Sequence, residues 1–224
     1  MPWSMRCACL VLGVWLLGPR SSAADPKLEL VVQTGHAAGV TSVATSEDGR
    51  QVLTGSRDQT AIVWDGRSGQ QLQTLKGHTG WINSVALSAD GKRALTASQD
   101  GTAVLWDAQG GEKLRTFTGH SDAVTAVAWS ADGKRVFTGS RDGTTRLWDA
   151  STGEELCRLL SLDGGEDWLV VTPEGFFDGS NGAWKLMAFR ETGTLNVVDD
   201  DATRKKFYRP GLLGTLYRGE KPKP

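Results

Sequence analysis

Cysteine, histidine and tyrosine are scarce in this chain of 224 residues, which has three, three and two of them, respectively. Cys7 and Cys9 lie near the N-terminus, so Cys157 is the one thiol of the remaining sequence. A single thiol makes neither an intrachain disulfide nor a cysteine zinc site. A domain of this size buries enough surface to fold without such cross-links. Disulfide-stabilised and zinc-stabilised folds are therefore excluded.

Neither sign of charge is in excess, because 25 Lys and Arg face 26 Asp and Glu. A nucleic-acid partner is not expected, since such a protein normally has a basic excess or a basic stripe. We also expect no cofactor and no metal site. Asp199, Asp200 and Asp201 are consecutive, so their side chains point in different directions, and no spaced ligands follow them.

Residues 1–24 have the three-part pattern of a secretory signal peptide. Arg6 precedes an apolar run over residues 7–17, and small residues end the segment at Ala24. The alternative is a buried core helix. The run is too short to span a bilayer as a mature helix. We therefore expect cleavage after Ala24, no membrane span in the mature chain, and a periplasmic or secreted location.

A sequence of 42 residues is repeated three times. Gly-His pairs end at His36, His78 and His120, and Trp-Asp pairs begin at Trp64, Trp106 and Trp148. Turn signals divide each unit into four short apolar runs, which in the first unit are residues 40–44, 51–56, 60–64 and 71–75. Glycine, with 28 residues, recurs between the runs. Each repeat is therefore predicted to form a small antiparallel sheet with two faces to cover.

These three in-register units resemble the blades of WD-repeat β-propellers, whose period is about 40–45 residues. The resemblance implies an all-β fold with three regular four-stranded blades and an irregular C-terminal unit. We expect a signal peptide at 1–24, WD-repeat blades at 25–160 (repeats of about 35–76, 77–118 and 119–160) and an irregular segment at 161–224.

The resemblance also implies a buried hydrogen-bonded tetrad in each blade, made of a Ser or Thr, the repeat His, an Asp and the Trp. Carried onto this sequence, the tetrads are Ser56, His36, Asp58 and Trp64; Ser98, His78, Asp100 and Trp106; and Ser140, His120, Asp142 and Trp148. Ser, His and Asp also occur together in hydrolases, but such an enzyme needs one exposed site, not three at the same spacing. We therefore expect no catalytic residue here.

The sequence does not determine how the blades close into a propeller ring. Residues 27–33 are predicted to be a fourth strand without its first three, and in this family one blade is usually built from both chain ends. The apolar runs at 168–172, 176–178, 184–189 and 194–198 would then form a degenerate fourth blade. The alternatives are a four-unit monomer, or a ring completed by a partner or by a second copy as a homo-oligomer.

The C-terminal segment has a resemblance of its own. The stretches GEDWLVVTPEGFFDGS and KKFYRPGLLGTLYRGE are similar to a segment that follows WD repeats in bacterial, planctomycete-type proteins, some of which carry a caspase-like peptidase domain. The peptidase motifs themselves are absent from the sequence. Asp201 is predicted to cap a short helix at 202–208 that Pro210 stops. Cys157 is predicted to be a small buried hydrophobic residue in a fourth strand.

Propellers commonly bind partners on one rim, and four residues are candidates for that role here: Arg57, Trp81, Gln99 and Arg141. An aromatic residue with arginines is typical of an interaction hot spot. The alternative is that Trp81 packs on a neighbouring blade while the arginines are solvated. The favoured function is an exported, non-enzymatic protein–protein scaffold. The alternatives are an extracytoplasmic propeller that binds or cleaves a glycan or peptide, and a fragment of a larger WD-repeat protein.

Overall fold

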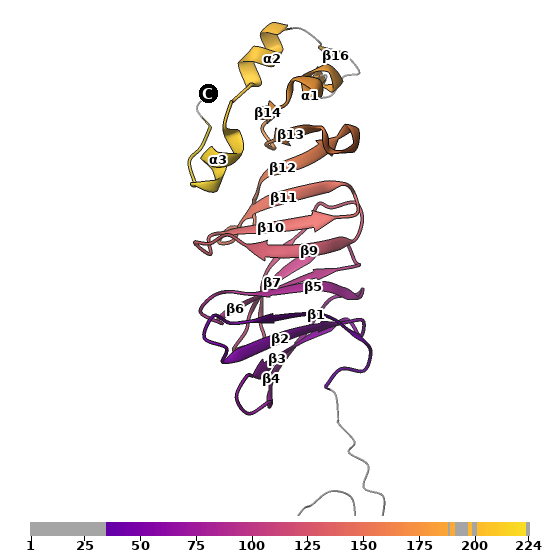
Figure 1. Ribbon diagram of the computed structural model, residues 1–224, viewed down its shortest axis with the longest axis vertical. Coiled ribbons are helices and arrows are strands. Elements are labelled where there is room, and N and C mark those ends of the chain that lie inside the picture. The colour runs from indigo at the N-terminus through magenta and orange to yellow at the C-terminus, as the bar shows by residue number, and fades with distance from the viewer. Residues whose placement is uncertain (1–34, 188, 191–196, 199–200, 223–224) are drawn as a thin grey trace, which may run out of the picture. The chain divides into compact units, whose positions relative to one another are not determined.

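Strands dominate the computed structural model, which describes residues 35–187, 189–190, 197–198 and 201–222, all within one unit of the chain. Two four-stranded antiparallel sheets come first, in simple strand order (Figure 1). The first sheet consists of β1 (Val40–Thr45), β2 (Gln51–Ser56), β3 (Thr60–Asp65) and β4 (Gln71–Lys76). The second consists of β5 (Ile82–Leu87), β6 (Arg93–Ser98), β7 (Ala103–Asp107) and β8 (Lys113–Phe117). The all-β fold class predicted from the sequence is confirmed.

The third sheet has six strands in the order β14-β13-β12-β11-β10-β9. Its first four strands along the chain are β9 (Val124–Trp129), β10 (Arg135–Ser140), β11 (Thr144–Asp149) and β12 (Glu155–Leu162). The short helix η1 (Asp163–Gly165) leads into β13 (Asp167–Val171) and β14 (Phe177–Gly179). Residues 168–172 and 176–178 therefore extend the third sheet and do not start a fourth one.

The remaining C-terminal elements are short. They are α1 (Asn181–Leu186), β15 (Phe189–Arg190), β16 (Val197–Val198), α2 (Asp201–Phe207) and α3 (Leu212–Tyr217). The apolar run at 184–189 was expected to be a strand, but its first part lies in α1, because Ala183 and Trp184 pack on β13 and β14 through one helical face. The predicted short helix is confirmed as α2, which begins at Asp201 itself. The strand expected at residues 27–33 lies outside the described residues.

Serine and aspartate side chains shape the turn between the first two strands of each sheet. Ser46 Oγ accepts the backbone N–H of Gln51 at 3.0 Å and donates to Asp48 at 2.7 Å. The chain then passes through Gly49 with φ +66°, a conformation that glycine adopts without strain. Ser88 and Ser130 make the same pair of bonds in the other repeats. The local sequence thus contributes to the hairpin register independently of the contacts between sheets.

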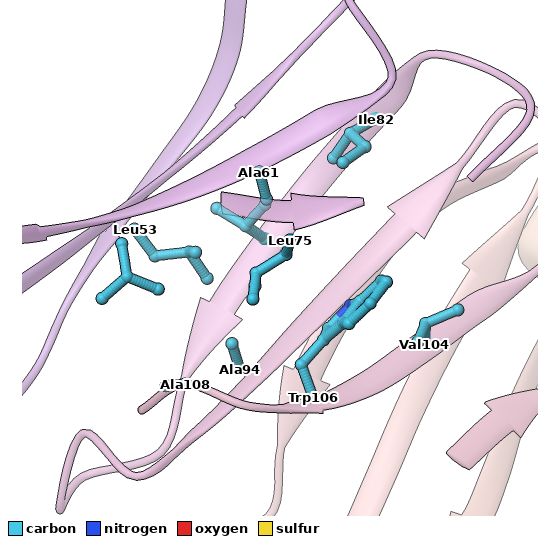
Figure 2. Packing of buried hydrophobic residues seen from close by; sticks show 10 residues of the cluster. Leu53, Ala61, Leu75, Ile82, Ala94, Val104, Trp106 and Ala108 are labelled. Carbon is cyan, nitrogen blue, oxygen red and sulfur yellow. The ribbon is translucent and has the colours of Figure 1, made fainter. Parts of the chain in front are cut away.

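Neighbouring sheets pack face to face through side chains at equivalent repeat positions. Leu53 of the first sheet is buried with Ile82 and Trp106 of the second (Figure 2). Gly55 leaves room for this contact, because a Cβ there would lie 2.7 Å from the side chains of Ile82 and Val85. Burial of each large apolar side chain stabilises the fold by about 1.5–3 kcal/mol. A second such cluster joins the second and third sheets and contains Leu95, Leu105, Phe117, Val124, Val136 and Trp148.

Hydrogen bonds between the innermost strands add to this packing. Thr41 Oγ1 donates to the backbone carbonyl of Ile82 at 2.5 Å. One sheet further along, Asn83 Nδ2 donates to the carbonyl of Val124 at 2.9 Å. Each sheet is therefore tied to the next at the same end, where the segment before its first strand meets the turn between its second and third strands.

The outward face of the third sheet is covered by α3. Leu147 occupies the repeat position of Val63 and Leu105, which pack on a following sheet, but it is buried with Leu212 and Leu216 of α3. Phe137 stacks on Tyr217 with ring centroids 6.3 Å apart. The C-terminal helix thus takes the place that another sheet would fill.

Candidate functional site

Each repeat contains a buried hydrogen-bonded unit built on its histidine. The imidazole Nδ1 lies 2.8–2.9 Å from an aspartate Oδ2, and Nε2 lies 2.7–2.8 Å from a threonine Oγ1. That hydroxyl also accepts the indole N–H of the repeat tryptophan at 2.8 Å. The units are His36, Asp58, Thr54 and Trp64; His78, Asp100, Thr96 and Trp106; and His120, Asp142, Thr138 and Trp148.

The assignment of Ser56, Ser98 and Ser140 to these tetrads is therefore corrected. Threonines two residues earlier on the same strands hold the place between histidine and tryptophan. Residues two apart on a strand point to the same face, so the sequence spacing alone did not separate them. The serine sits at the end of the strand instead, where Ser98 Oγ donates to the carbonyl of Gly80 and accepts the N–H of Asp100, both at 3.1 Å.

The aspartates of these units are strongly acidic. Burial alone would raise the pKa of Asp58, but hydrogen bonds from Thr60, Ala37 and His36 outweigh it and lower the pKa to about 2. The same balance lowers the pKa of Asp100 to about 2 and holds the pKa of Asp142 well below its usual range. These carboxylates are therefore ionised at neutral pH, and each accepts a hydrogen bond from the imidazole Nδ1–H.

Burial is the largest influence on the pKa of His78 and lowers it below 6.5, although Asp100 opposes the effect. A neutral imidazole that donates a hydrogen bond from Nδ1 can accept one at Nε2 from the threonine hydroxyl. Every polar group of the unit is then paired. The three imidazole side chains are only 3%, 1% and 1% exposed. A substrate does not reach them, and the geometry makes these residues structural.

Cys157 is also inaccessible. Burial, followed by the charge of Glu155, raises the pKa of its thiol to about 12. It packs against Leu212 and Leu216 beneath α3, where it is a buried apolar side chain as the sequence predicts. A buried thiol with so high a pKa is not a nucleophile at neutral pH.

A hollow of about 470 Å³ opens on the rim where the sheets meet. It is formed by the turns between second and third strands, by the segment before β5, and by residues of β1 and β5 themselves. It brings together all four rim residues predicted from the sequence. Its lining residues are Thr41, Arg57, Gln59, Thr79, Gly80, Trp81, Asn83, Gln99 and Arg141.

Trp81 is half exposed in this hollow, so its contact with the neighbouring blade leaves part of the indole ring open to solvent. The guanidinium of Arg57 lies over its indole ring, 5.2 Å from the centroid. The equivalent positions in the other repeats are Gly39 and Ala123. The tryptophan therefore gives the rim an apolar surface that neither of the other described repeats provides.

Backbone hydrogen bonds fix the positions of the rim residues. The N–H of Gln99 donates to the carbonyl of Trp81 at 2.8 Å. Arg57 and Arg141 make the equivalent bonds to Gly39 and Ala123, each at 3.0 Å. These turns are thus held in place while their side chains project to solvent, which limits the entropy lost when a ligand binds.

Gln59 is a lining residue that sequence reasoning missed. It has φ +72°, a left-handed conformation that is rare for residues other than glycine. Gly101 and Gly143 take this place in the other repeats, with φ +82° and +81°. The signal was present in the alignment of the repeats, where Gln stands opposite two glycines. A residue with a strained backbone conformation at a surface hollow is often retained for function.

Metal-binding clusters and membrane-spanning helices are both absent from the described residues. No group of three or more His, Cys, Asp or Glu side chains there is placed to hold a metal ion. In the same part of the chain, every helix is too short or too polar to cross a membrane.

Comparison with known proteins agrees with the repeat geometry. The family described as WD domain, G-beta repeat matches residues 28–65, 69–107 and 111–149, which together make up just over half of the chain. The chain therefore belongs to the WD-repeat family. Such repeats generally serve as non-enzymatic scaffolds for protein interaction.

One curated relative is transducin beta-like protein 3 of Rattus norvegicus. It is 42% identical over 62 residues. The aligned part is 28% of this chain and 7% of that protein. The chain thus resembles a small part of a much longer WD-repeat protein.

Proposed function

We propose that this protein is an exported, non-enzymatic scaffold whose protein partner docks on the rim hollow. The observation that carries the proposal is the placement of Trp81, half exposed, among Arg57, Gln99 and Arg141 around a hollow of about 470 Å³. Tryptophan and arginine are the residues most enriched in interaction hot spots. The histidines, in contrast, are all committed to the buried units.

The experiment is affinity capture from the native exported fraction, followed by mass spectrometry. The bait is the chain from Asp25 onward, compared with Trp81→Ala and Arg141→Ala variants. Arg67→Ala is the matched control, because Arg67 is an exposed arginine on the turn between β3 and β4, at the opposite end of the first sheet. Partners retained by wild type and control but lost by both rim variants support the proposal. Partners retained by all four baits contradict it.

The proposed export rests on residues 1–24, which lie outside the described residues. The apolar run and the small residues before Asp25 support it. N-terminal sequencing of the native protein tests it, with Asp25 as the expected first residue and Met1 as the contradicting result.

The C-terminal segment is proposed to be the unit that follows WD repeats in bacterial, planctomycete-type proteins, some with a caspase-like peptidase. Support comes from contacts between its two resembling stretches. Asp178 Oδ2 accepts the N–H of Gly211 at 2.7 Å, and the carbonyl of Phe177 accepts the N–H of Arg209 at 2.7 Å. If these stretches form one unit, Asp178→Ala should release α3 to limited proteolysis, whereas unchanged protection of α3 would contradict the proposal.

We further propose that the chain self-associates through the open face of the first sheet. Val40 and Val43 are 56% and 63% exposed, whereas the equivalent Ile82 and Val85 are 0% and 6% exposed because a sheet packs on them. A second copy would continue this sheet-on-sheet packing. Light scattering on the chain from Asp25 tests it: a dimer that Val43→Asp dissociates is expected, and a monomer at all concentrations is the contrary result.

A further inference from the structure

We infer that the rim hollow recognises an acidic segment of a protein partner, with carboxylates bound by Arg57 and Arg141 beside Trp81. This inference rests on the proposed function of the same hollow and specifies the chemistry of its ligand. It follows from the charge, the hydrogen bonding and the shape of the hollow.

The hollow is positively charged. Its lining includes the guanidinium groups of Arg57 and Arg141 and no carboxylate. Within the described part of the chain, no ion pair joins either arginine to an acidic residue. Two guanidinium groups that line one hollow attract a ligand of opposite charge.

The aspartates next to these arginines do not line the hollow, and their carboxylates are engaged elsewhere. Asp58, Asp100 and Asp142 accept hydrogen bonds from the buried imidazoles and from nearby backbone N–H groups. Their side chains are only 11%, 13% and 6% exposed. Asp122 is exposed, but it does not line the hollow, and its Oδ1 accepts the N–H of Ala123 at 2.6 Å. A ligand at the hollow therefore meets the guanidinium groups first.

A carboxylate suits this site better than a sugar. A guanidinium donates two parallel hydrogen bonds to a carboxylate, which gives strong and directional binding. Sugar rings stack on aromatic faces, and Arg57 lies over the ring of Trp81, which reduces the aromatic surface on which a sugar could stack. The remaining indole surface suits an apolar side chain that flanks the acidic one. The volume of about 470 Å³ is within the range of ligand pockets, roughly 300–1,000 Å³, and holds a short peptide segment.

The equivalent positions of three repeats provide a built-in comparison. Arg57, Gln99 and Arg141 are each 42 residues apart and all line the hollow. Gln99 is the one of the three without a charge. Replacing it with arginine adds a third cation at a position whose backbone N–H is already held by Trp81, so the chemistry predicts a gain of binding there.

The test measures fluorescence anisotropy of a fluorescein-labelled peptide, Glu-Leu-Glu-Gly-Glu-Leu-Glu, with the chain from Asp25 onward. The control peptide has glutamine in place of each glutamate. We expect the acidic peptide to bind at least tenfold more tightly than the control, and its binding to weaken as NaCl is raised from 50 to 300 mM. Arg57→Gln and Arg141→Gln should each weaken binding about tenfold, Arg67→Gln should leave it unchanged, and Gln99→Arg should tighten it severalfold.

Equal binding of the two peptides, or no response to the rim variants, overturns the inference. So does binding of polygalacturonate, an acidic glycan, at the same residues when the acidic peptide does not bind. Failure of the proposed scaffold function gives a different result: partner capture is then unaffected by both Trp81→Ala and Arg141→Ala. If capture requires Trp81 but is unaffected by Arg57→Gln and by salt, the proposed scaffold function stands. The inference that the ligand is acidic is then overturned.

Discussion

The hydroxyl of Thr96 accepts the indole N–H of Trp106 at 2.8 Å, and the same oxygen lies 2.7 Å from Nε2 of His78. Thr96 and Trp106 are 0% and 1% exposed. One hydroxyl therefore joins the tryptophan to the histidine and aspartate in the interior of the second sheet. Its loss would leave two buried polar groups without a partner.

Thr96→Val should lower the free energy of unfolding by about 1–3 kcal/mol, because the methyl group keeps the shape but leaves the indole N–H and the imidazole unpaired. Thr116→Val is the matched control, since Thr116 is exposed on β8. Urea unfolding followed by tryptophan fluorescence measures both. Equal midpoints for the two variants would contradict the role assigned to Thr96.

Stability should fall as the pH is lowered, in two stages. The folded state lowers the pKa of His78 below 6.5, so the unfolded chain binds more protons there and stability is lost as the pH falls below 6.5. Asp58 and Asp100 have a pKa of about 2 against an ordinary 3.8, so their contribution is lost between about pH 4 and pH 2. Urea midpoints across this range test both stages. The Asp100→Asn variant should have a shallower slope below pH 4, and a slope equal to that of wild type would refute the assignment.

Gln59→Gly should stabilise the protein slightly, by up to about 1 kcal/mol. The left-handed conformation costs a residue with a Cβ roughly 1–2 kcal/mol, which is partly offset by the greater freedom of glycine in the unfolded chain. The reverse change, Gly143→Gln, places a side chain at φ +81° and should destabilise. Thermal unfolding measures the pair. If the two changes shift the midpoint in the same direction, the strain argument fails.

Cys157 should not react with Ellman's reagent in the folded chain from Asp25 onward. Its thiol is buried beneath α3 and its pKa is about 12, so almost no thiolate is present at pH 8. Complete reaction is expected in 6 M guanidinium chloride, which serves as the control. Rapid labelling of the native protein would show that α3 does not cover this face.

The repeating part of the fold was predictable because the same local signals occur three times. Each Asp-Gly turn, each apolar run and each Gly-His pair recurs at the same spacing, so strand bounds such as Gln51–Ser56 follow from the sequence. The choice between Ser56 and Thr54 was not predictable in this way. Both are hydroxyl residues on one face of one strand, and only their hydrogen-bond partners separate them: Thr54 accepts the indole N–H of Trp64, whereas Ser56 donates to the carbonyl of Ala38.

The C-terminal segment was harder to predict because its elements depend on tertiary contacts. Gln73 and Arg115 have polar side chains that bind the following sheet. Gln73 donates to the carbonyl of Gly110, and Arg115 donates to the carbonyl of Ser151. Cys157 occupies the same repeat position but meets α3. Its apolar character was a signal that no further sheet follows, but the identity of the covering helix is not encoded in any local pattern.

The boundary between two sheets and the boundary between the third sheet and α3 differ in how they tolerate change, because the first joins similar repeats and the second joins a repeat to a helix. A duplicated unit inserted between two existing ones would find matching neighbours on both sides. A unit added after β12 would have to displace Leu212 and Leu216 from Leu147. A duplicated unit is thus accommodated more easily between two existing units than after β12.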